Sequence, residues 1–258
     1  MDGEQRFQSK EPKYFLYGAL VGQWRYTEPQ SKESIIRDGK RIPSPVYMAR
    51  KAFRTKKNIE QYSGVSHLTL TTGISITVVS LCVWMLNQVT PFEWLTIPLV
   101  LLYANLSEYL GHKGPMHKET RFLSLIYQRH TLEHHYFFTH EAMAIESTKD
   151  YKAVLFPLEM IAFFFGCFAL PVALLIYFLL SPNVAFLFVI TSTLYFLNYE
   201  ILHLVYHLKS DSWAGKLPII EFLSHHHTLH HDPRLMNRYN FNVTFPLFDF
   251  LFGTYRKS

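Results

Sequence analysis

Positive charge is missing from two long parts of the sequence. All 25 Lys and Arg residues fall in three blocks, and none occurs in residues 66–110 or 153–208. Long stretches without such charges are typical of membrane-spanning helices, which need about 20 apolar residues each. The composition, 49% hydrophobic and 16% aromatic, is also rich for a water-soluble protein. The sequence therefore indicates an integral membrane protein.

Cysteine is nearly absent, and several cofactor and targeting motifs are absent altogether. Cys82 and Cys167 lie in different uncharged stretches and form no Cys-x-x-Cys pair, which argues against a disulfide scaffold or a thiolate zinc site. The first 15 residues lack the apolar core of a signal peptide, so we expect insertion to rely on the first crossing. The net charge of +5 comes with no nucleic-acid recognition motif, so we expect no nucleic-acid partner.

Each uncharged stretch is long enough to cross a bilayer twice. The first is interrupted at residues 87–93 and the second at residues 180–183, where turn-forming residues occur. The third crossing is overlong and contains Pro157 and Pro171, so we expect it to be kinked or strongly tilted. The four predicted crossings are residues 68–88, 92–110, 153–180 and 183–206.

The distribution of Lys and Arg predicts the orientation of these crossings. Two helical hairpins return the chain to its starting side each time, and all three basic blocks then lie on that side. Because basic loops face the cytoplasm, we expect both termini to be cytoplasmic, in the endoplasmic reticulum if the source is eukaryotic and in the inner membrane if it is bacterial. Residues 1–65 then form a basic cytoplasmic segment, and residues 66–258 form the membrane-embedded domain.

Histidine is abundant and clustered. Of 14 histidines, only His67 stands alone. In the predicted topology, which was derived without the histidines, all four clusters emerge on the cytoplasmic side. The clusters are His112 and His117, then His130, His134, His135 and His140, then His203 and His207, and finally His225, His226, His227, His230 and His231.

The last cluster has the spacing of a metal site. On a helix, positions i, i+3 and i+4 share one face, so we expect His227, His230 and His231 to converge on one point. Neutral imidazole binds zinc, copper, iron and nickel. Eight or more imidazoles exceed what one ion can bind, so the sequence predicts two metal ions. Soluble di-iron bundles use two Glu-x-x-His pairs, and only Glu200 and His203 match that pattern here.

The ordered series of histidines resembles the histidine boxes of the sterol desaturase/fatty acid hydroxylase superfamily, whose members are integral membrane oxidoreductases. Residues 237–255, NRYNFNVTFPLFDFLFGTY, are similar to the segment that follows the last box in that family. With the predicted crossings, the resemblance implies an all-α membrane protein with four transmembrane helices and a cytoplasmic, histidine-rich helical cap that holds a dimetal site. The implied metal ligands are His112, His117, His130, His134, His135, His203, His207, His227, His230 and His231.

One cluster departs from the family pattern. The second box is usually His-x-x-His-His, whereas this sequence has three residues between His130 and His134. On a regular helix, His130 and His135 do not share one face as closely as the last box does. The departure requires either a local bend or the replacement of one ligand by His140. We interpret His225 and His226 as flanking residues.

The resemblance also implies a chemistry. It implies a non-haem di-iron centre, in which zinc can replace iron in recombinant protein, that uses O2 to hydroxylate an unactivated C–H bond of a membrane lipid. Desaturation by the same centre is the alternative, and a metal transporter or a nonenzymatic metal-binding membrane protein is the alternative of another class. The sequence has no dinucleotide or haem motif, so an external electron donor is expected. Glu108 and Glu200 are candidates to accept the outer N–H of ligating imidazoles.

Overall fold

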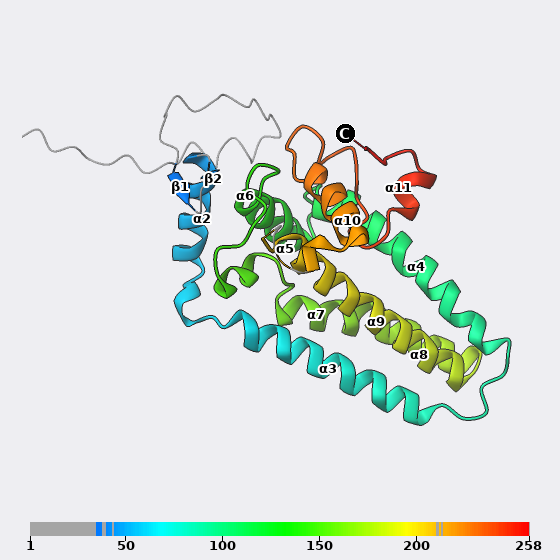
Figure 1. Ribbon diagram of the computed structural model, residues 1–258. Coiled ribbons are helices and arrows are strands. Elements are labelled where there is room, and N and C mark those ends of the chain that lie inside the picture. The colour runs from blue at the N-terminus through cyan, green and yellow to red at the C-terminus, as the bar shows by residue number, and fades with distance from the viewer. Residues whose placement is uncertain (1–34, 38–39, 43, 210–211, 213, 258) are drawn as a thin grey trace, which may run out of the picture. The chain divides into compact units, whose positions relative to one another are not determined.

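The computed structural model describes residues 35–37, 40–42, 44–209, 212 and 214–257. Most of the predicted basic segment, residues 1–65, therefore lies outside the described residues. The described residues belong to one compact unit. The unit is helical apart from a short antiparallel hairpin (Figure 1). Its strands and α-helices are β1 Ile35–Arg37, β2 Lys40–Ile42, α2 Ser44–Lys56, α3 Gly64–Met85, α4 Thr96–Gly111, α5 Ser124–Tyr127, α6 His135–Phe137, α7 Leu158–Phe164, α8 Leu170–Leu179, α9 Pro182–Tyr206, α10 Pro218–His230 and α11 Leu247–Leu251.

Short helical turns with non-α geometry connect or extend these helices. Three of them are π-helical, and a π-turn contains one residue more than an α-turn because its hydrogen bonds join residues i and i+5. The 3₁₀ turns are Ile59–Gln61, Glu93–Leu95, Thr148–Ala153 and Ala214–Lys216, and the π-turns are His112–Met116, Gln128–His134 and Phe165–Ala169.

Three described helical segments are long and apolar enough to cross a membrane: Gly64–Met85, Thr148–Leu179 and Pro182–Tyr206. They correspond to the first, third and fourth predicted crossings. The second predicted crossing, residues 92–110, is also helical, but α4 has only 16 residues. At 1.5 Å per residue α4 spans about 24 Å, less than the hydrocarbon core of about 30 Å. A fourth span therefore remains a prediction.

The third predicted crossing departs from α geometry where its prolines occur. Pro157 is the N-cap of α7, and Pro171 lies in the first turn of α8, directly after the π-turn Phe165–Ala169. Proline has no N–H and clashes with the carbonyl four residues earlier in a regular helix. The π-turn is a common way to accommodate such a break. The crossing is therefore irregular, and its kink or strong tilt stays a prediction.

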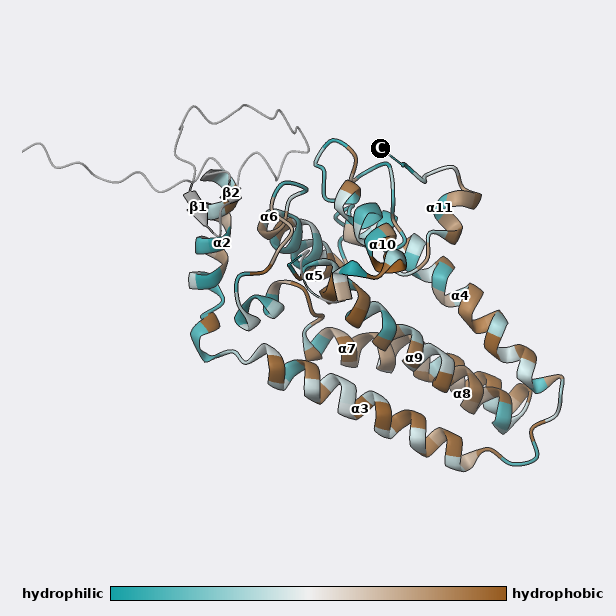
Figure 2. Cartoon of the chain, in the orientation of Figure 1, coloured by the Kyte–Doolittle hydropathy of each residue, from teal (hydrophilic) through white to brown (hydrophobic). Residues whose placement is uncertain are grey.

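Helix α9 is the centre of the helical bundle. Helices α3, α4 and α8 all pack against it, and 44% of its apolar window is buried, compared with 11% for α3. Apolar side chains on α3, α4 and α8 instead remain exposed, as expected for helices that face lipid. Figure 2 shows the hydrophobic colouring concentrated along these helices, with hydrophilic segments gathered around α10.

Two connecting turns meet at the end of the bundle that is distant from α10 (Figure 1). Asn183 Nδ2 donates to the carbonyl of Asn87 at 2.8 Å and to Glu93 Oε2 at 3.2 Å. Ser181 Oγ donates to Glu93 Oε1 at 2.6 Å. These bonds join the turn between α3 and α4 to the turn between α8 and α9, so both helical hairpins predicted from the sequence reverse at the same end.

Helix α2 belongs to the core at the opposite end. Phe53 of α2 and Ile59 are buried in a hydrophobic cluster with Phe137 and Phe138, which follow His135, and with Leu204 of α9. Helix α2 and the turn at Ile59 are therefore packed onto the segment between residues 137 and 155.

Candidate metal centre

The ten predicted metal ligands lie together and form two groups of five. In each group, one nitrogen from every imidazole lies within 4.8 Å of the others, and all ten side chains are buried. We name the groups A and B. Group A is His112, His117, His130, His135 and His230, and group B is His134, His203, His207, His227 and His231.

Four of the five histidines of group A lie in or beside two of the π-turns. His112 and His117 are five residues apart and flank the π-turn His112–Met116, while His130 and His135 are five residues apart across the π-turn Gln128–His134. In the first turn, Gly114 has non-helical backbone angles (φ −92°, ψ −107°), so the chain is kinked between His112 and His117. A π-turn closes its hydrogen bond at residue i+5, which brings His130 and His135 to the same side of the second turn. The extra residue in the second box is therefore accommodated by a π-turn, which is the local bend that the sequence required.

Group B uses ordinary α-helical spacing. His203 and His207 are four residues apart at the end of α9, and His227 and His231 are four residues apart at the end of α10. Residues i and i+4 share a helix face. The Nε2 atoms of His227 and His231 are 3.0 Å apart, and those of His227 and His207 are 3.3 Å apart.

The prediction that His227, His230 and His231 converge on one point is wrong. His230 belongs to group A, where its Nε2 lies 2.9 Å from His117 Nε2. Positions i+3 and i+4 are about 100° apart around a helix axis, since one turn contains 3.6 residues. His230 and His231 therefore point in different directions from α10, one into group A and the other into group B.

The histidines that were not assigned as ligands lie outside both groups. His140, the possible substitute, contributes its main-chain N–H to the carbonyl of His231 at 3.2 Å and is not part of either cluster. His225 is exposed, with Nε2 3.2 Å from the carbonyl of Lys257. His226 is buried and lies 3.3 Å from Asp249.

Main-chain carbonyls orient half of the grouped imidazoles. The Nδ1 atoms of His134, His207, His230 and His231 lie 2.8–3.0 Å from carbonyl oxygens, and His112 Nδ1 contacts the carbonyl of Phe241. A carbonyl only accepts hydrogen bonds, so each of these Nδ1 atoms carries the proton and donates it. The Nε2 lone pair is then left facing the centre of the group, as metal-ligating histidines require.

The carbonyls for the two groups come from different segments of the chain. In group B, the acceptors for His231, His207 and His134 are Phe138, Met143 and Ala153, all in the loop after the second box. In group A, the acceptors for His230 and His112 are Tyr239 and Phe241, both in the C-terminal tail. Each group therefore has its own orienting segment.

The orienting role predicted for Glu108 and Glu200 is not what the structure shows. Glu108 accepts the main-chain N–H and the hydroxyl of Thr244 at 3.0 and 2.7 Å. Glu200 accepts the main-chain N–H of Phe156 at 3.2 Å. Among the described residues, neither carboxylate has a hydrogen bond to an imidazole. The two carboxylates instead fix neighbouring segments to α4 and α9.

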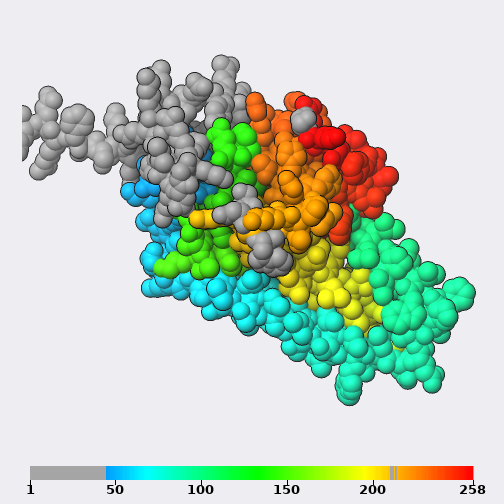
Figure 3. All heavy atoms as spheres, viewed as in Figure 1, coloured from blue at the N-terminus to red at the C-terminus, as the bar shows by residue number. Residues whose placement is uncertain are grey.

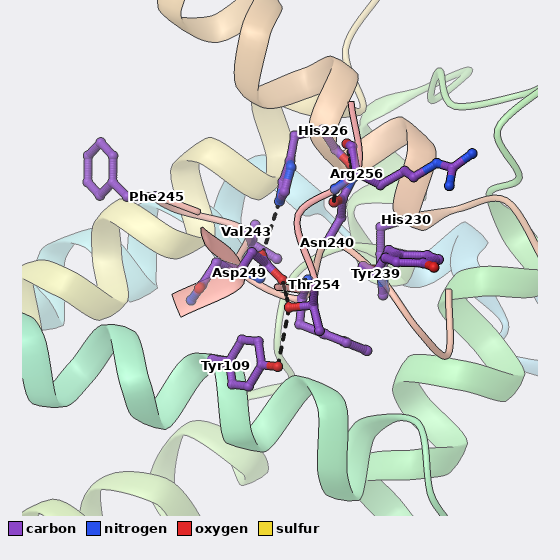
Figure 4. A network of polar contacts seen from close by, with 12 residues as sticks. Tyr109, His226, His230, Tyr239, Asn240, Val243, Phe245, Asp249, Thr254 and Arg256 are labelled. Atoms are coloured by element: carbon purple, nitrogen blue, oxygen red, sulfur yellow. Dashed lines mark hydrogen bonds and ion pairs between the residues drawn. The ribbon is translucent and has the colours of Figure 1, made fainter. Parts of the chain in front are cut away.

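Asp249 is a structural residue that the sequence reasoning missed. Its buried carboxylate accepts the main-chain N–H groups of Phe241 and Asn242 at 2.9 and 2.8 Å and the hydroxyl of Thr254 at 2.7 Å. Figure 4 shows Asp249 between Thr254 and His226. Asp249 lies within residues 237–255, the tail that resembles the family. The spacing of residues in that tail did not indicate that Asp249 holds it in place.

Asn240 completes this organisation of the tail. It adopts a left-handed backbone conformation with φ of 60°, and its side chain donates to the carbonyl of His226 at 3.0 Å and accepts the N–H of Arg256 at 2.7 Å. The tail is thereby held against α10, as the red and orange surfaces in Figure 3 also show. The carbonyls on either side of Asn240 are the ones that orient His230 and His112.

The donor set fits bound cations. Burial lowers the pKa of His134 to about 3 and the pKa of His230 to about 4, so both rings are neutral at physiological pH. His134 and His231 both carry their protons on Nδ1, yet their Nε2 atoms are only 3.1 Å apart. Two bare lone pairs at that distance repel each other, and a metal ion between them converts the repulsion into two bonds.

The fold and the site define a helical membrane protein with paired histidine groups suited to metal binding. The model of the family described as fatty acid hydroxylase matches residues 97–254. The chain belongs to this family, and the resemblance inferred from the histidine boxes is confirmed. The family makes the chain an oxidoreductase.

Comparison with solved structures shows one protein with a similar fold. The structure described as full-length Scs7p, with only the hydroxylase domain visible, has 18% sequence identity and a TM-score of 0.53 to this chain. The match covers 74% of this chain and 66% of that one, and at this identity it shows a shared fold. No curated protein matches the sequence.

Proposed function

We propose that this protein hydroxylates an unactivated C–H bond of a membrane lipid with O2, using two iron ions held by groups A and B. The observation that carries the proposal is the division of ten buried histidines into two groups of five, each with convergent nitrogens. Membership of the fatty acid hydroxylase family supports the reaction class. Two iron ions, when bound, supply the activation of O2 and the oxidising power that side chains lack.

The chain's own residues hold and isolate this centre. The carbonyls of Phe138, Met143 and Tyr239 fix the Nδ1–H tautomer of three imidazoles, which directs their Nε2 atoms inward. Phe138 and Phe241 are both 0% exposed beside the groups. Their rings exclude water, which limits side reactions of an oxidising centre.

The reaction requires electrons from outside this chain. Hydroxylation inserts one oxygen atom into the C–H bond, and the other oxygen leaves as water with two protons and two electrons. We propose an external reductase or small electron carrier as the donor. The two groups lie at the end of the apolar bundle opposite the Asn87–Asn183 turns (Figure 1), where a lipid chain and a water-soluble donor can both approach.

A transport function is less well supported by the positions of the ligands. A metal transporter places ionisable ligands near the middle of the membrane to form a path. Here the grouped histidines lie at the ends of α4, α9 and α10 or in the connecting turns. This arrangement favours an enzyme that acts at the membrane face.

The experiment combines metal analysis with product analysis. Protein purified in detergent and loaded anaerobically with Fe(II) is expected to bind two iron ions per chain. Reconstituted with lipid, a reductant system and isotopically labelled O2, it is expected to give a lipid that contains one labelled oxygen atom. His225→Ala, an exposed flanking variant, serves as the control that retains activity. A product that has lost two hydrogens without gaining oxygen would show desaturation, and an iron-loaded chain that changes no lipid would refute the proposal.

A further inference from the structure

Arg50 of α2 is among the largest of the fully buried side chains in the described part of the chain, with 2% exposure. A buried guanidinium is costly unless its donors are satisfied. Its Nε donates to the carbonyl of Phe137 at 2.9 Å, its Nη2 donates to the carbonyl of Ala142 at 2.6 Å, and its Nη1 pairs with Glu146 at 3.1 Å. The planar fork thus binds three points of one loop, which an ammonium group cannot reproduce.

The two main-chain acceptors of Arg50 are placed next to the carbonyls that orient group B. Phe137 directly precedes Phe138, whose carbonyl accepts from His231 Nδ1 at 2.8 Å. Ala142 directly precedes Met143, whose carbonyl accepts from His207 Nδ1 at 2.9 Å. Each carbonyl that Arg50 binds belongs to a planar peptide unit, and only the φ and ψ of Phe138 or Met143 separate that unit from the orienting carbonyl. Fixing the first unit therefore limits the positions that the orienting carbonyl can take.

A second arginine on α2 reinforces the same loop. Arg54 makes a bidentate pair with Asp150 at 2.9 and 2.8 Å and contacts Glu146 at 3.2 Å. Asp150 in turn accepts the main-chain N–H of Glu146 at 2.9 Å. The loop is therefore attached to α2 at both of its ends, and Arg50 lies nearer to the orienting carbonyls.

We infer that Arg50 is a positioning residue for group B, acting through the Phe138 and Met143 carbonyls on His231 and His207. The inference rests on the proposed dimetal function. Group A receives its orienting carbonyls from Tyr239 and Phe241 in the tail, and no described hydrogen bond joins Arg50 to the tail. Helix α2 also precedes residues 97–254, which the family model matches. Arg50 therefore contacts the metal-site loop from outside the matched domain.

The test measures metal binding at each group separately. One background contains His203→Ala and His231→Ala and retains group A, and the other contains His117→Ala and His230→Ala and retains group B. Arg50→Lys is added to each background and to the wild-type chain, and Co(II) binding is titrated by visible absorption. Arg121→Lys, at an exposed arginine whose guanidinium lies over Phe122, is the matched control.

We expect Arg50→Lys to weaken Co(II) binding by about 10-fold or more in the group B background, with no change in the group A background. Arg54→Lys is expected to have a smaller effect of the same selectivity, and it provides a second variant if Arg50→Lys does not fold. Equal weakening in both backgrounds, or unchanged binding at group B in a folded variant, would overturn the inference. A wild-type chain that binds no metal would refute the proposed function itself. If the wild type and Arg50→Lys both bind two ions with equal affinity, only the role of Arg50 is refuted and the proposed function stands.

Discussion

His134 and His135 are consecutive in the sequence, but they belong to different metal-ligand groups. His134 Nε2 lies 3.1 Å from His203 Nε2 in group B, whereas His135 Nε2 lies 3.1 Å from His130 Nε2 in group A. The same division occurs between His230 and His231. The second and the last histidine boxes therefore each supply ligands to both groups, and the two groups share their supporting helices.

The division predicts that single substitutions in the last box empty different groups. His227→Ala should remove the ion of group B and His230→Ala the ion of group A, because each loses one of five donors from its own group only. Each variant should retain about one metal ion per chain, and lipid oxidation should fall more than about 100-fold, beyond the cost of losing an outer hydrogen-bond partner. Metal analysis with His225→Ala as control checks this, and loss of both ions in either variant would contradict it.

Because the π-turn Gln128–His134 contains one residue more than an α-turn, we expect metal binding to survive the deletion of one residue from it. Removing Leu132 should convert the π-turn to an α-turn, which leaves His130 and His135 four residues apart on one face. We expect this variant to retain two metal ions per chain. Deletion of Leu229 in the regular helix α10 should instead rotate His230 and His231 by about 100° and abolish binding. Similar metal content in the two deletion variants would count against the π-turn explanation.

Asp249→Asn is expected to weaken group A selectively. An amide cannot replace both carboxylate oxygens as acceptors for the N–H groups of Phe241 and Asn242. The Phe241 carbonyl should then orient His112 less well, which should lower the metal affinity of group A by about 10-fold to 100-fold. Titration in the single-group backgrounds measures this, with Glu221→Gln on the exposed side of α10 as control. Weakening confined to group B would contradict the assignment.

Gly64 is expected to be intolerant of a side chain. A Cβ there would clash with the carbonyl oxygen of Thr148 and would lie 2.7 Å from Tyr151 Cβ, so Gly64→Ala should reduce the free energy of unfolding by about 1–3 kcal/mol. Gly73 on the same helix has no heavy atom within 4 Å of such a Cβ. Gly73→Ala should be neutral or stabilising by about 0.5–1 kcal/mol. Thermal unfolding in detergent compares the two, and equal midpoints would contradict the close packing.

The topology predicts opposite accessibility for the two ends of the bundle. In a background with Cys82 and Cys167 replaced by Ala, Thr90→Cys should be labelled only from the non-cytoplasmic side and Lys257→Cys only from the cytoplasmic side. The physical basis is the basic blocks on the histidine side and the uncharged helices between. Labelling of both positions from the same side of sealed vesicles would refute four crossings.

The sequence by itself determined the membrane character, the helical hairpins and the clustering of the histidines, from which the family resemblance selected ten as ligands. These features depend on composition and periodicity along the chain, such as the absence of Lys and Arg from residues 66–110 and 153–208. Hydrophobic runs indicate where helices are needed whatever their partners are. Spacing within a box also indicates which residues can ligate a metal.

Only the tertiary structure decided how the histidines are shared and what orients them. Whether His230 joins His227 or His117 depends on where α10 lies relative to the π-turn His112–Met116, which no local spacing specifies. The orienting acceptors are main-chain carbonyls, such as that of Met143, and every residue has a carbonyl, so the sequence carries no mark of them. For the same reason Arg50 reads as one more basic residue of a charged segment until folding buries its guanidinium against the loop.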